Sequence, residues 1–200
     1  MFRELIIASN NTGKIREFNE MFSPLGITVH SQKDYQISET EEPYPTFIEN
    51  ALAKARHVSK YTGLPALADD SGICVNALGG APGVHSARYA GDPKSDVRNN
   101  RKLIDDLKKH EDKSASYYCV LVYLRHADDP NPIIAEAWWE GEVISTPRGS
   151  NGFGYDPYFF IPSLGKTAAE LLPEEKNKIS HRGQALRVLV DKMRTCRIFA

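Results

Sequence analysis

The first third of the chain changes its hydrophobic period at short intervals. Leu5–Ala8 is an apolar run that predicts a short buried strand. A polar turn follows, and four apolar side chains then recur at helical spacing until Pro24: Ile15, Phe18, Met21 and Phe22. A strand, a turn and a helix in this order place the first free N–H groups of the helix beside the strand end, where anions bind readily.

A similar alternation follows further along the chain. Thr46-Phe-Ile-Glu49 has the form of a capping box and predicts the start of a helix that Gly63 stops. The apolar face of this predicted helix consists of Phe47, Ala51, Ala55 and Val58. Leu64–Ala68 predicts a second buried strand, which runs into Asp69-Asp70-Ser71-Gly72 before a strand resumes at Ile73–Val75.

The second half of the chain adds a hairpin. Ser116–Leu124 and Pro132–Trp139 predict two strands joined by a polar loop at His126–Asn131. The other predicted elements are a helix marked by Val97, Ile104 and Leu107, a strand at Tyr158–Ile161, a short helix opened by Thr167-Ala-Ala-Glu170 and ended by Pro173, and a last helix from about Ser180 to Met193. This order predicts an α/β protein with a mixed central β-sheet flanked by helices, as one domain over residues 1–200 with two lobes.

Composition narrows the class of partner. The chain has 200 residues, with 25 basic and 26 acidic side chains and a net charge of −1. This charge argues against nonspecific electrostatic binding of nucleic acid, which needs many Lys and Arg side chains on one face. Its three cysteines are widely spaced without a Cys-x-x-Cys pair, so we expect reduced, mostly buried thiols in a cytoplasmic protein. The longest apolar run, Tyr117–Leu124, is too short to span a membrane. The apolar stretch within MFRELIIASN is too short for that of a signal peptide.

The stretch Ser9-Asn-Asn-Thr-Gly-Lys14 ends in Gly-Lys, as many phosphate-binding loops do. It is not a P-loop, because Ala8 and Ile15 stand where that motif needs Gly and Ser or Thr. From these residues alone, Lys14 is either a phosphate ligand or one more lysine on a helix.

Two acidic stretches could hold a metal ion. Asp69-Asp70 ends a predicted strand, a good place for a ligand site in an α/β protein, although a solvated turn explains the pair equally well. A second carboxylate from the acidic run that contains Glu39, Glu41 and Glu42 would complete a hard oxygen site suited to Mg²⁺. The plainer interpretation of that run is a solvated charged loop.

Two further stretches could contact a nucleotide. In GSNGFGYDP, residues 149–157, glycines would let the Phe153 ring approach a flat base closely, whereas the alternative is a β-turn with packed aromatic rings. Lys176 and Ser180-His181-Arg182 gather donors near a predicted helix start, whereas the alternative is a charged surface turn. Lys54 has the same two interpretations.

Six motifs in order resemble one family over nearly the whole chain. They are Ser9-Asn-Asn-Thr-Gly-Lys14 with Glu17, Thr46-Phe-Ile-Glu-Asn50, Ala68-Asp-Asp-Ser-Gly72, Leu78-Gly-Gly-Ala-Pro-Gly83 with Ser86-Ala-Arg-Tyr89, Gly152-Phe-Gly-Tyr-Asp-Pro157, and Glu175-Lys176 with Ser180-His-Arg182. The chain thereby resembles the inosine triphosphate pyrophosphatase family, and within it the bacterial pyrophosphatases of noncanonical purine nucleoside triphosphates.

The resemblance implies an activity and a quaternary structure. Members of the family hydrolyse ITP, dITP and XTP to the monophosphate and diphosphate with Mg²⁺, which clears deaminated purines from the nucleotide pool. They are usually homodimers with a long mixed sheet and a cleft between two lobes. The expected partners are therefore a nucleotide substrate and a second copy of the chain, with no nucleic acid and no membrane.

The resemblance also implies residue roles. It makes Asp70 the general base and a metal ligand, with Glu42 as the other acidic ligand; Glu42 is preferred to Glu41 for its distance from Thr46-Phe-Ile-Glu-Asn50. The implied substrate-binding residues are Ser9, Asn10, Asn11, Thr12, Gly13, Lys14, Lys54, Ser71, Phe153, Gly154, Tyr155, Asp156, Lys176, His181 and Arg182. Asn10 departs from the pattern, because close relatives often have Gly there.

Selectivity has a simple chemical basis. Hypoxanthine and xanthine present the acceptor O6 where adenine presents an amino donor. Backbone N–H groups or Arg182 would pair with O6 and stay unpaired against adenine, at about 1–3 kcal/mol per buried donor.

Other classes fit the sequence less well. The Glu-rich run of a Nudix box is missing, and Maf-like proteins carry Ser-Pro-Arg-Arg at the N-terminal turn. A non-catalytic nucleotide sensor would keep Lys14, Phe153 and Arg182 but could lose Asp70, which is present here.

Overall fold

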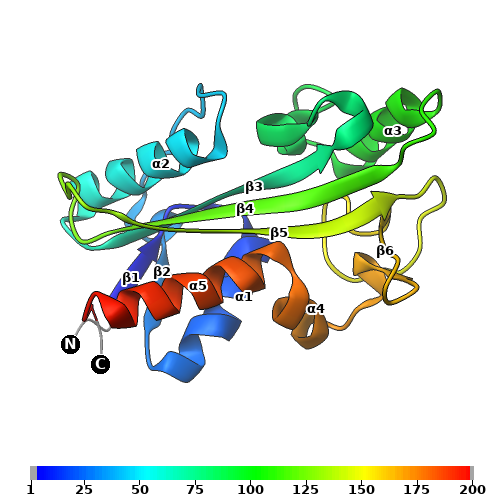
Figure 1. The fold of residues 1–200 in the computed structure, drawn as a ribbon. Coiled ribbons are helices and arrows are strands. Elements are labelled where there is room, and N and C mark those ends of the chain that lie inside the picture. Colours follow the sequence, from blue (N-terminus) through cyan, green and yellow to red (C-terminus); the bar gives the residue numbers. More distant parts are fainter. Residues whose placement is uncertain (1–3, 199–200) are drawn as a thin grey trace. The chain divides into compact units, whose positions relative to one another are not determined.

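The computed structural model describes residues 4–198 and contains one seven-stranded mixed sheet in the order β2-β1-β3-β4-β5-β6-β7 (Figure 1). The strands are β1 (Glu4–Ile7), β2 (Thr28–Ser31), β3 (Ala66–Val75), β4 (Ser114–Leu124), β5 (Ile133–Val143), β6 (Phe159–Ile161) and β7 (Lys166–Thr167). β1 pairs in parallel with β2 and β3, whereas β6 is antiparallel to β5 and β7. The prediction of an α/β protein with a mixed sheet is confirmed.

The helices follow the start and stop signals of the sequence. They are α1 (Thr12–Phe22), α2 (Phe47–Thr62), α3 (Asp96–Leu107), α4 (Pro173–Ile179) and α5 (His181–Thr195), with short 3₁₀ turns between them. The Thr46 side chain caps α2 by accepting from the Glu49 N–H, and Gly63 ends α2 with a positive φ of 69°.

The chain divides into two compact units. The first unit comprises residues 1–70, 119–137 and 182–200, and the second comprises residues 71–118 and 138–181. Strands β3, β4 and β5 contribute residues to both units. Residues 1–3 and 199–200, which the predicted domain 1–200 includes, lie outside the described residues.

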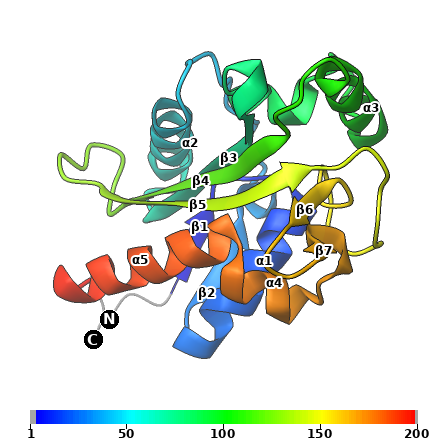
Figure 2. The same ribbon diagram turned by 45° about the vertical axis from the view of Figure 1, so that its right-hand side comes forward.

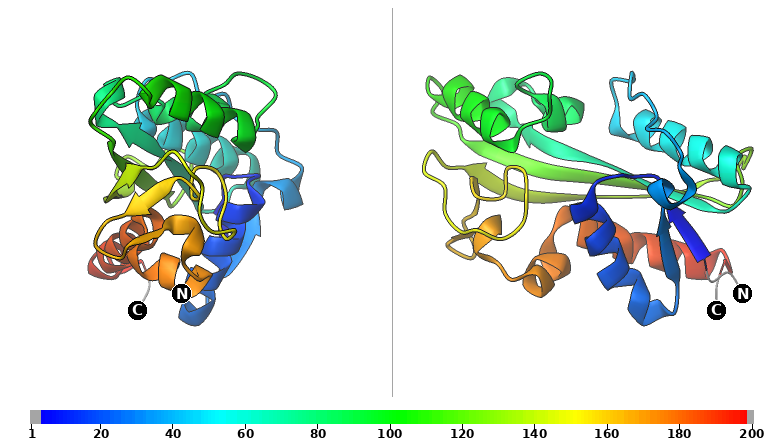
Figure 3. Two further views of the ribbon diagram at one scale, coloured as in Figure 1. Left: turned by 90° about the vertical axis from the view of Figure 1, so that its right-hand side faces the viewer. Right: turned by 180° about the vertical axis from the view of Figure 1, so that it is seen from behind.

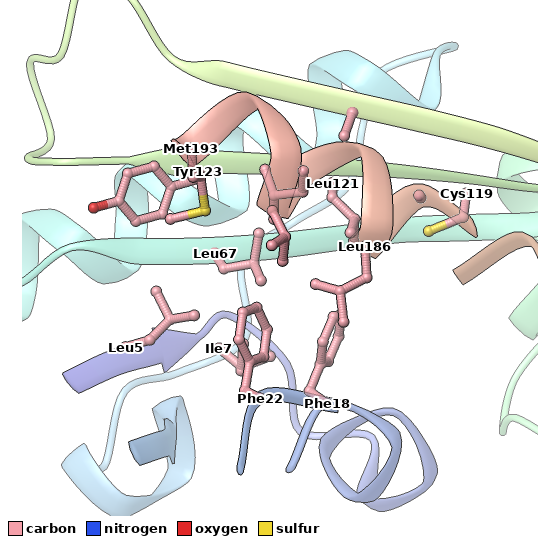
Figure 4. Close-up of a cluster of buried hydrophobic side chains, with 14 of the residues drawn as sticks. Leu5, Ile7, Phe18, Phe22, Leu67, Cys119, Leu121, Tyr123, Leu186 and Met193 are labelled. Carbon is pink, nitrogen blue, oxygen red and sulfur yellow. The ribbon is translucent and has the colours of Figure 1, made fainter. Parts of the chain in front are cut away.

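In the first unit, α2 covers one face of the sheet and α1 and α5 cover the other (Figures 1 and 3). The close-up in Figure 4 shows the core on the α1 and α5 side. Its buried members are Leu5, Ile7, Phe18, Phe22, Ile27, Leu67, Cys119, Leu121, Tyr123, Ala135, Ala137, Ala185, Leu186, Leu189, Val190 and Met193. Each large apolar side chain buried here contributes about 1.5–3 kcal/mol, so this core fixes α1 and α5 against the sheet.

The second unit has its own core. Its buried members come from β3, α3, β4, β5, the loop before β6, β6 and the segment after β7. They are Ile73, Val75, Leu103, Leu107, Ala115, Tyr117, Trp139, Val143, Tyr155, Phe159, Ile161, Ala168 and Leu171. Figure 2 shows β6 and β7 continuing from β5, with α3 and α4 on opposite sides of the strands in this unit.

Several predicted details are wrong. Asp69 and Asp70 do not end a strand, because β3 runs without a break through the predicted turn. Pro173 begins α4 instead of ending a helix, since proline suits the first helical position. Val97 is exposed, and the short strand β2 was not predicted.

The cysteines differ in their exposure. All three cysteines are free, as expected, but Cys196 is exposed and Cys74 half-buried, so only Cys119 fits the prediction of a buried thiol. Within residues 4–198, no helix is long and apolar enough to cross a membrane.

Candidate active site

Strand pairing brings the predicted phosphate turn to the Asp69-Asp70 pair. β1 lies parallel to β3 with Ile7 opposite Leu67, and the Ala8 N–H donates to the Leu67 carbonyl at 2.9 Å. The chain therefore leaves β1 beside the next residues of β3, where the two carboxylates follow. Both belong to the first unit.

The turn from Ser9 to Lys14 is held by its own side chains. Ser9 Oγ accepts from the Asn11 N–H at 3.1 Å, and Asn11 Oδ1 caps α1 by accepting from the Lys14 N–H at 3.1 Å. Asn10 Nδ2 donates to Glu39 Oε1 at 3.3 Å, which links the turn to the acidic loop. Thr12 and Gly13 form the first turn of α1, where backbone N–H groups have no partner within the helix and can receive an anion.

Asp69 is buried at the centre of a charged network. Its carboxylate accepts from the Lys14 ammonium, from Arg182 Nε at 2.8 Å and from the Cys119 thiol at 3.2 Å. Burial works to raise the pKa of Asp69, but Arg182 and Lys14 hold it well below its usual range. Asp69 is therefore a permanent anion at neutral pH.

Asp70 lies in a different environment. Its Oδ1 accepts from Lys54 Nζ at 3.0 Å, whereas its buried Oδ2 accepts no hydrogen bond from the residues that the structure describes. Burial raises the pKa of this carboxyl above its ordinary value, against the opposing effect of Lys54 and Lys14. An acceptor oxygen of this kind suits a metal ion or a proton from water.

Glu42 shares a cation with Asp70. Lys54 Nζ lies 2.6 Å from Glu42 Oε1 and 3.0 Å from Asp70 Oδ1, so one ammonium bridges the two carboxylates. Burial lowers the pKa of Lys54, but Asp70 and Glu42 outweigh it, and the pKa is raised. The buried Asn50 holds the loop that carries Glu42, since its side chain accepts from the Tyr44 N–H at 3.1 Å and donates to the Tyr44 carbonyl at 3.0 Å.

These two carboxylates fit a magnesium ion. Among residues 4–198, no group of three or more His, Cys, Asp and Glu side chains could hold a metal. Mg²⁺ does not require such a group, because it usually takes one or two carboxylates and completes its shell with water and substrate phosphate. Asp70 and Glu42 already share one cation, and the open Asp70 Oδ2 adds a hard oxygen donor.

In the second unit, Asp156 organises the Gly-rich stretch. It accepts from Lys176 Nζ at 2.7 Å, from the Phe153 N–H at 2.9 Å and from Tyr117 OH at 3.3 Å. The Lys176 ammonium lies 4.9 Å from the centre of the Phe153 ring. Asp156 therefore fixes the backbone that presents Phe153.

Buried neighbours in the second unit also hold His181, Tyr155 and Gly154. The His181 ring stacks on Tyr117, with ring centres 4.7 Å apart and planes at 8°. Tyr155 OH donates to the Ser86 carbonyl at 2.7 Å, and the Gly154 carbonyl accepts from Asn100 Nδ2 at 2.9 Å. Ser71 follows Asp70 on β3 and is the first residue of this unit.

The predicted site residues thus form one group in each unit. The first unit holds Ser9, Asn10, Asn11, Thr12, Gly13, Lys14, Glu42, Lys54, Asp70 and Arg182, and the second holds Ser71, Phe153, Gly154, Tyr155, Asp156, Lys176 and His181. Arg182 differs most from its expected surroundings, because its buried guanidinium binds Asp69 and Glu17. Its role in base recognition stays a prediction.

Sequence reasoning did not find roles for Glu17, Cys119 and Asn50. Asn50 had a usable signal, because it closes the motif Thr46-Phe-Ile-Glu-Asn50 and follows the capping box directly. Cys119 had none, since a lone cysteine in an apolar strand indicates only a packed core residue.

The chain is similar to known proteins over nearly its full length. Residues 5–192 match the model of the Ham1 family. A dITP/XTP pyrophosphatase from Ralstonia nicotianae is 63% identical, with 96% of this chain and 97% of the relative covered. A solved HAM1 protein from Coxiella burnetii is 47% identical with a TM-score of 0.90, covering 97% of this chain and 100% of that one. A nucleoside-triphosphatase / dITP/XTP pyrophosphatase from Mycobacterium abscessus is 38% identical with a TM-score of 0.73, covering 94% and 98%.

Proposed function

Because this chain belongs to the Ham1 family, we propose that it hydrolyses ITP, dITP and XTP. Water cleaves the anhydride bond between the α and β phosphates, which gives the nucleoside monophosphate and diphosphate. The enzyme thereby removes deaminated purines from the nucleotide pool. The relatives named dITP/XTP pyrophosphatase support this substrate class.

One observation of the structure carries the proposal. The Lys54 ammonium bridges Asp70 and Glu42, while Lys14 and the start of α1 lie on the same unit beside Asp69. Two carboxylates with a shared cation and a cationic helix start are the components that phosphoryl chemistry requires, since it depends on positioning and charge neutralisation.

Residues of the first unit are assigned to the phosphates. Lys14, Ser9, Asn11 and the first N–H groups of α1 bind the phosphate chain, because a helix N-terminus and a lysine both favour anions. Asp70 takes a proton from the attacking water at Oδ2, a contribution of about 10²–10⁴-fold for a well-placed general base. Lys54 supports the carboxylates and adds positive charge beside the phosphates.

Asp70 and Glu42 are the residues that would hold Mg²⁺. When bound, the ion would neutralise phosphate charge and polarise the phosphoryl oxygens. The choice of Glu42 over Glu41 is supported by the contact of Glu42 with Lys54.

Residues of the second unit are assigned to the nucleoside. Phe153 stacks on the base, and Gly154, Tyr155, Asp156, Lys176 and His181 are assigned to the same pocket, with Ser71 as a further substrate contact. Arg182, a residue of the first unit, is assigned separately as a substrate-binding residue. Donors that face O6 would discriminate against adenine, because its amino group leaves them unpaired.

Three further properties belong to the proposal. Both units act as one pyrophosphatase domain, supported by a family match that crosses them. The enzyme is a homodimer that binds neither nucleic acid nor membrane. It works in the cytoplasm, in agreement with its three free cysteines.

A panel of nucleoside triphosphates tests the function. Diphosphate release is measured for ITP, dITP, XTP, GTP and ATP with Mg²⁺, and we expect turnover of the first three far above ATP. Equal turnover of ATP and ITP would contradict the selectivity, and binding of ITP without turnover of any nucleotide would favour the sensor alternative.

A further inference from the structure

The two adjacent aspartates contact different partners. Asp69 binds the Lys14 ammonium, Arg182 and the Cys119 thiol, whereas Asp70 binds Lys54 and leaves Oδ2 open. Neighbours along a strand point to opposite faces, so the two carboxylates can reach different partners. Because Asp69 already has partners at both oxygens, it is unsuited to activate water.

The network around Asp69 is balanced in charge and draws on four elements. Lys14 and Glu17 come from α1, Asp69 from β3, Cys119 from β4 and Arg182 from α5. Arg182 binds Asp69 through Nε at 2.8 Å and Glu17 through its NH1 group, and its side chain is 2% exposed. The two cations and two anions therefore form one buried unit in which each charge has a partner.

Lys14 is the most exposed charged member of this network. Its side chain is 15% exposed, whereas the Asp69 side chain is 0% exposed. A free lysine side chain loses about 2 kcal/mol of rotamer entropy when it is fixed. A lysine already tethered by Asp69 has lost that freedom before a ligand arrives, and its ammonium has three N–H donors, so it can still donate to phosphate.

We propose that Asp69 is a positioning residue that directs Lys14 toward the phosphates. Arg182, which also binds Glu17, holds the Asp69 carboxylate in place. Arg182 shares the carboxylate, so Lys14 does not face a full negative charge alone. The Cys119 thiol adds a donor to Asp69 Oδ2, and burial raises the pKa of that thiol so that it keeps its proton. The inference rests on the proposed function, because it takes Lys14 as a phosphate ligand.

A double-mutant cycle tests the coupling of Asp69 to Lys14. Asp69→Asn, Lys14→Met and the double variant are compared in kcat/KM for dITP and in the affinity for inorganic diphosphate with Mg²⁺, by calorimetry. Each single variant should lose about 10- to 100-fold, the range for a hydrogen bond to a charged group. The kcat/KM and the diphosphate affinity of the double variant should lie less than about threefold below those of Lys14→Met, since the effects of mutations at coupled residues are not additive.

Lys54→Met provides the matched control. Lys54→Met removes a lysine that binds Asp70 and Glu42 instead of Asp69. Adding Asp69→Asn to Lys54→Met should therefore weaken diphosphate binding by the same factor as Asp69→Asn does in the unmodified enzyme. A loss of tenfold or more when Asp69→Asn is added to Lys14→Met would overturn the inference. Unchanged diphosphate affinity in Asp69→Asn would overturn it as well.

The cycle stays informative if Asp69→Asn fails to fold. That variant leaves two cations against one anion in a buried site, whereas the double variant restores one cation against one anion. In that case the diphosphate affinity of the folded double variant is compared with that of Lys14→Met. Equal affinities support the coupling of Asp69 to Lys14, and a further tenfold loss in the double variant contradicts it. If the unmodified enzyme did not turn over dITP and XTP, the proposed function would be refuted. The diphosphate affinities of the variants would still test whether Asp69 positions Lys14.

Discussion

Asp69 and Asp70 are consecutive residues of β3, but their carboxylates bind different lysines. Asp69 contacts Lys14, whereas Asp70 lies 3.0 Å from Lys54 Nζ. Of these two aspartates, Asp70 alone has a buried oxygen that accepts no hydrogen bond from residues 4–198. Both carboxylates therefore hold a lysine, but only Asp70 also has an oxygen that is available for chemistry.

Asp70→Asn should lower kcat strongly while part of the nucleotide affinity survives. The amide cannot take a proton from water, so kcat should fall by about 10²–10⁴-fold. Diphosphate release and calorimetric titration with dITP would measure the two effects separately. Asp191→Asn, at an exposed position on α5, is the control and should behave like the unmodified enzyme. An unchanged kcat in Asp70→Asn would remove Asp70 from its catalytic role.

Glu42→Gln should raise the Mg²⁺ concentration needed for half-maximal activity. Loss of one anionic oxygen weakens a site that takes only one or two carboxylates, and we expect about tenfold or more. Activity at saturating Mg²⁺ should recover in large part. Glu41→Gln is the matched control on the next residue; if it shifted the Mg²⁺ titration more than Glu42→Gln, the assignment of the acidic ligand would be reversed.

Gly152→Ala should disturb the Phe153 stretch more than Gly154→Ala. Both glycines have positive φ, 76° and 63°, which strains any alanine by about 1–3 kcal/mol. A Cβ at Gly152 would also lie 2.0 Å from Asp156 Oδ2, whereas a Cβ at Gly154 meets nothing within 4 Å. We expect a lower melting temperature and a higher KM for dITP in Gly152→Ala. Similar KM values in both variants would show that the contact with Asp156 is unimportant.

Asp129→Asn should destabilise the hairpin between β4 and β5 at neutral pH. Arg125 donates to Asp129 through Nε at 2.8 Å, and the N–H groups of Arg125 and Asn131 donate at 3.0 Å. Loss of these bonds should lower the free energy of unfolding of the variant by about 1–2 kcal/mol. Hydrogen bonds to charged groups are strong, but the half-exposed Arg125 side chain limits their effect.

The effect of Asp129→Asn should depend on pH. The hydrogen bond from Arg125 holds the pKa of Asp129 well below its unfolded value, so its stabilisation is present above about pH 4 and is lost as the pH falls through the folded pKa. Urea unfolding at pH 7 and pH 3 should therefore show a smaller difference between variant and unmodified enzyme at pH 3. Asp128→Asn, at the exposed neighbour, should change stability by less than about 0.5 kcal/mol at either pH.

The sequence predicted the strands and helices in which the spacing of apolar residues is clear. The change from an apolar run at Leu5–Ala8 to helical spacing after Ile15 identified β1 and α1, because strand and helix bury side chains at different intervals. Asp69-Asp70-Ser71-Gly72 was taken for a turn, since its composition is that of a turn. Ion pairs with Lys14, Arg182 and Lys54 instead allow both carboxylates to stay within the strand.

The sequence motifs predict candidate site residues but not the contacts between them. Motif order singles out Lys14, Glu42 and Asp70 as candidates. The contact between Asp69 and Arg182 joins residues 113 positions apart, and only the packing of α5 on the sheet creates it. No local pattern at either position indicates such a partner.

The balanced network of Lys14, Glu17, Asp69 and Arg182 restricts how this sequence can evolve. Replacing one charged member alone leaves an uncompensated buried charge, which typically costs about 3–5 kcal/mol. That is a large fraction of the about 5–15 kcal/mol by which a domain is stable. A change of charge at one of the four positions should therefore be accompanied by a compensating change at an oppositely charged partner, even though only Lys14 and Arg182 were expected to meet the substrate.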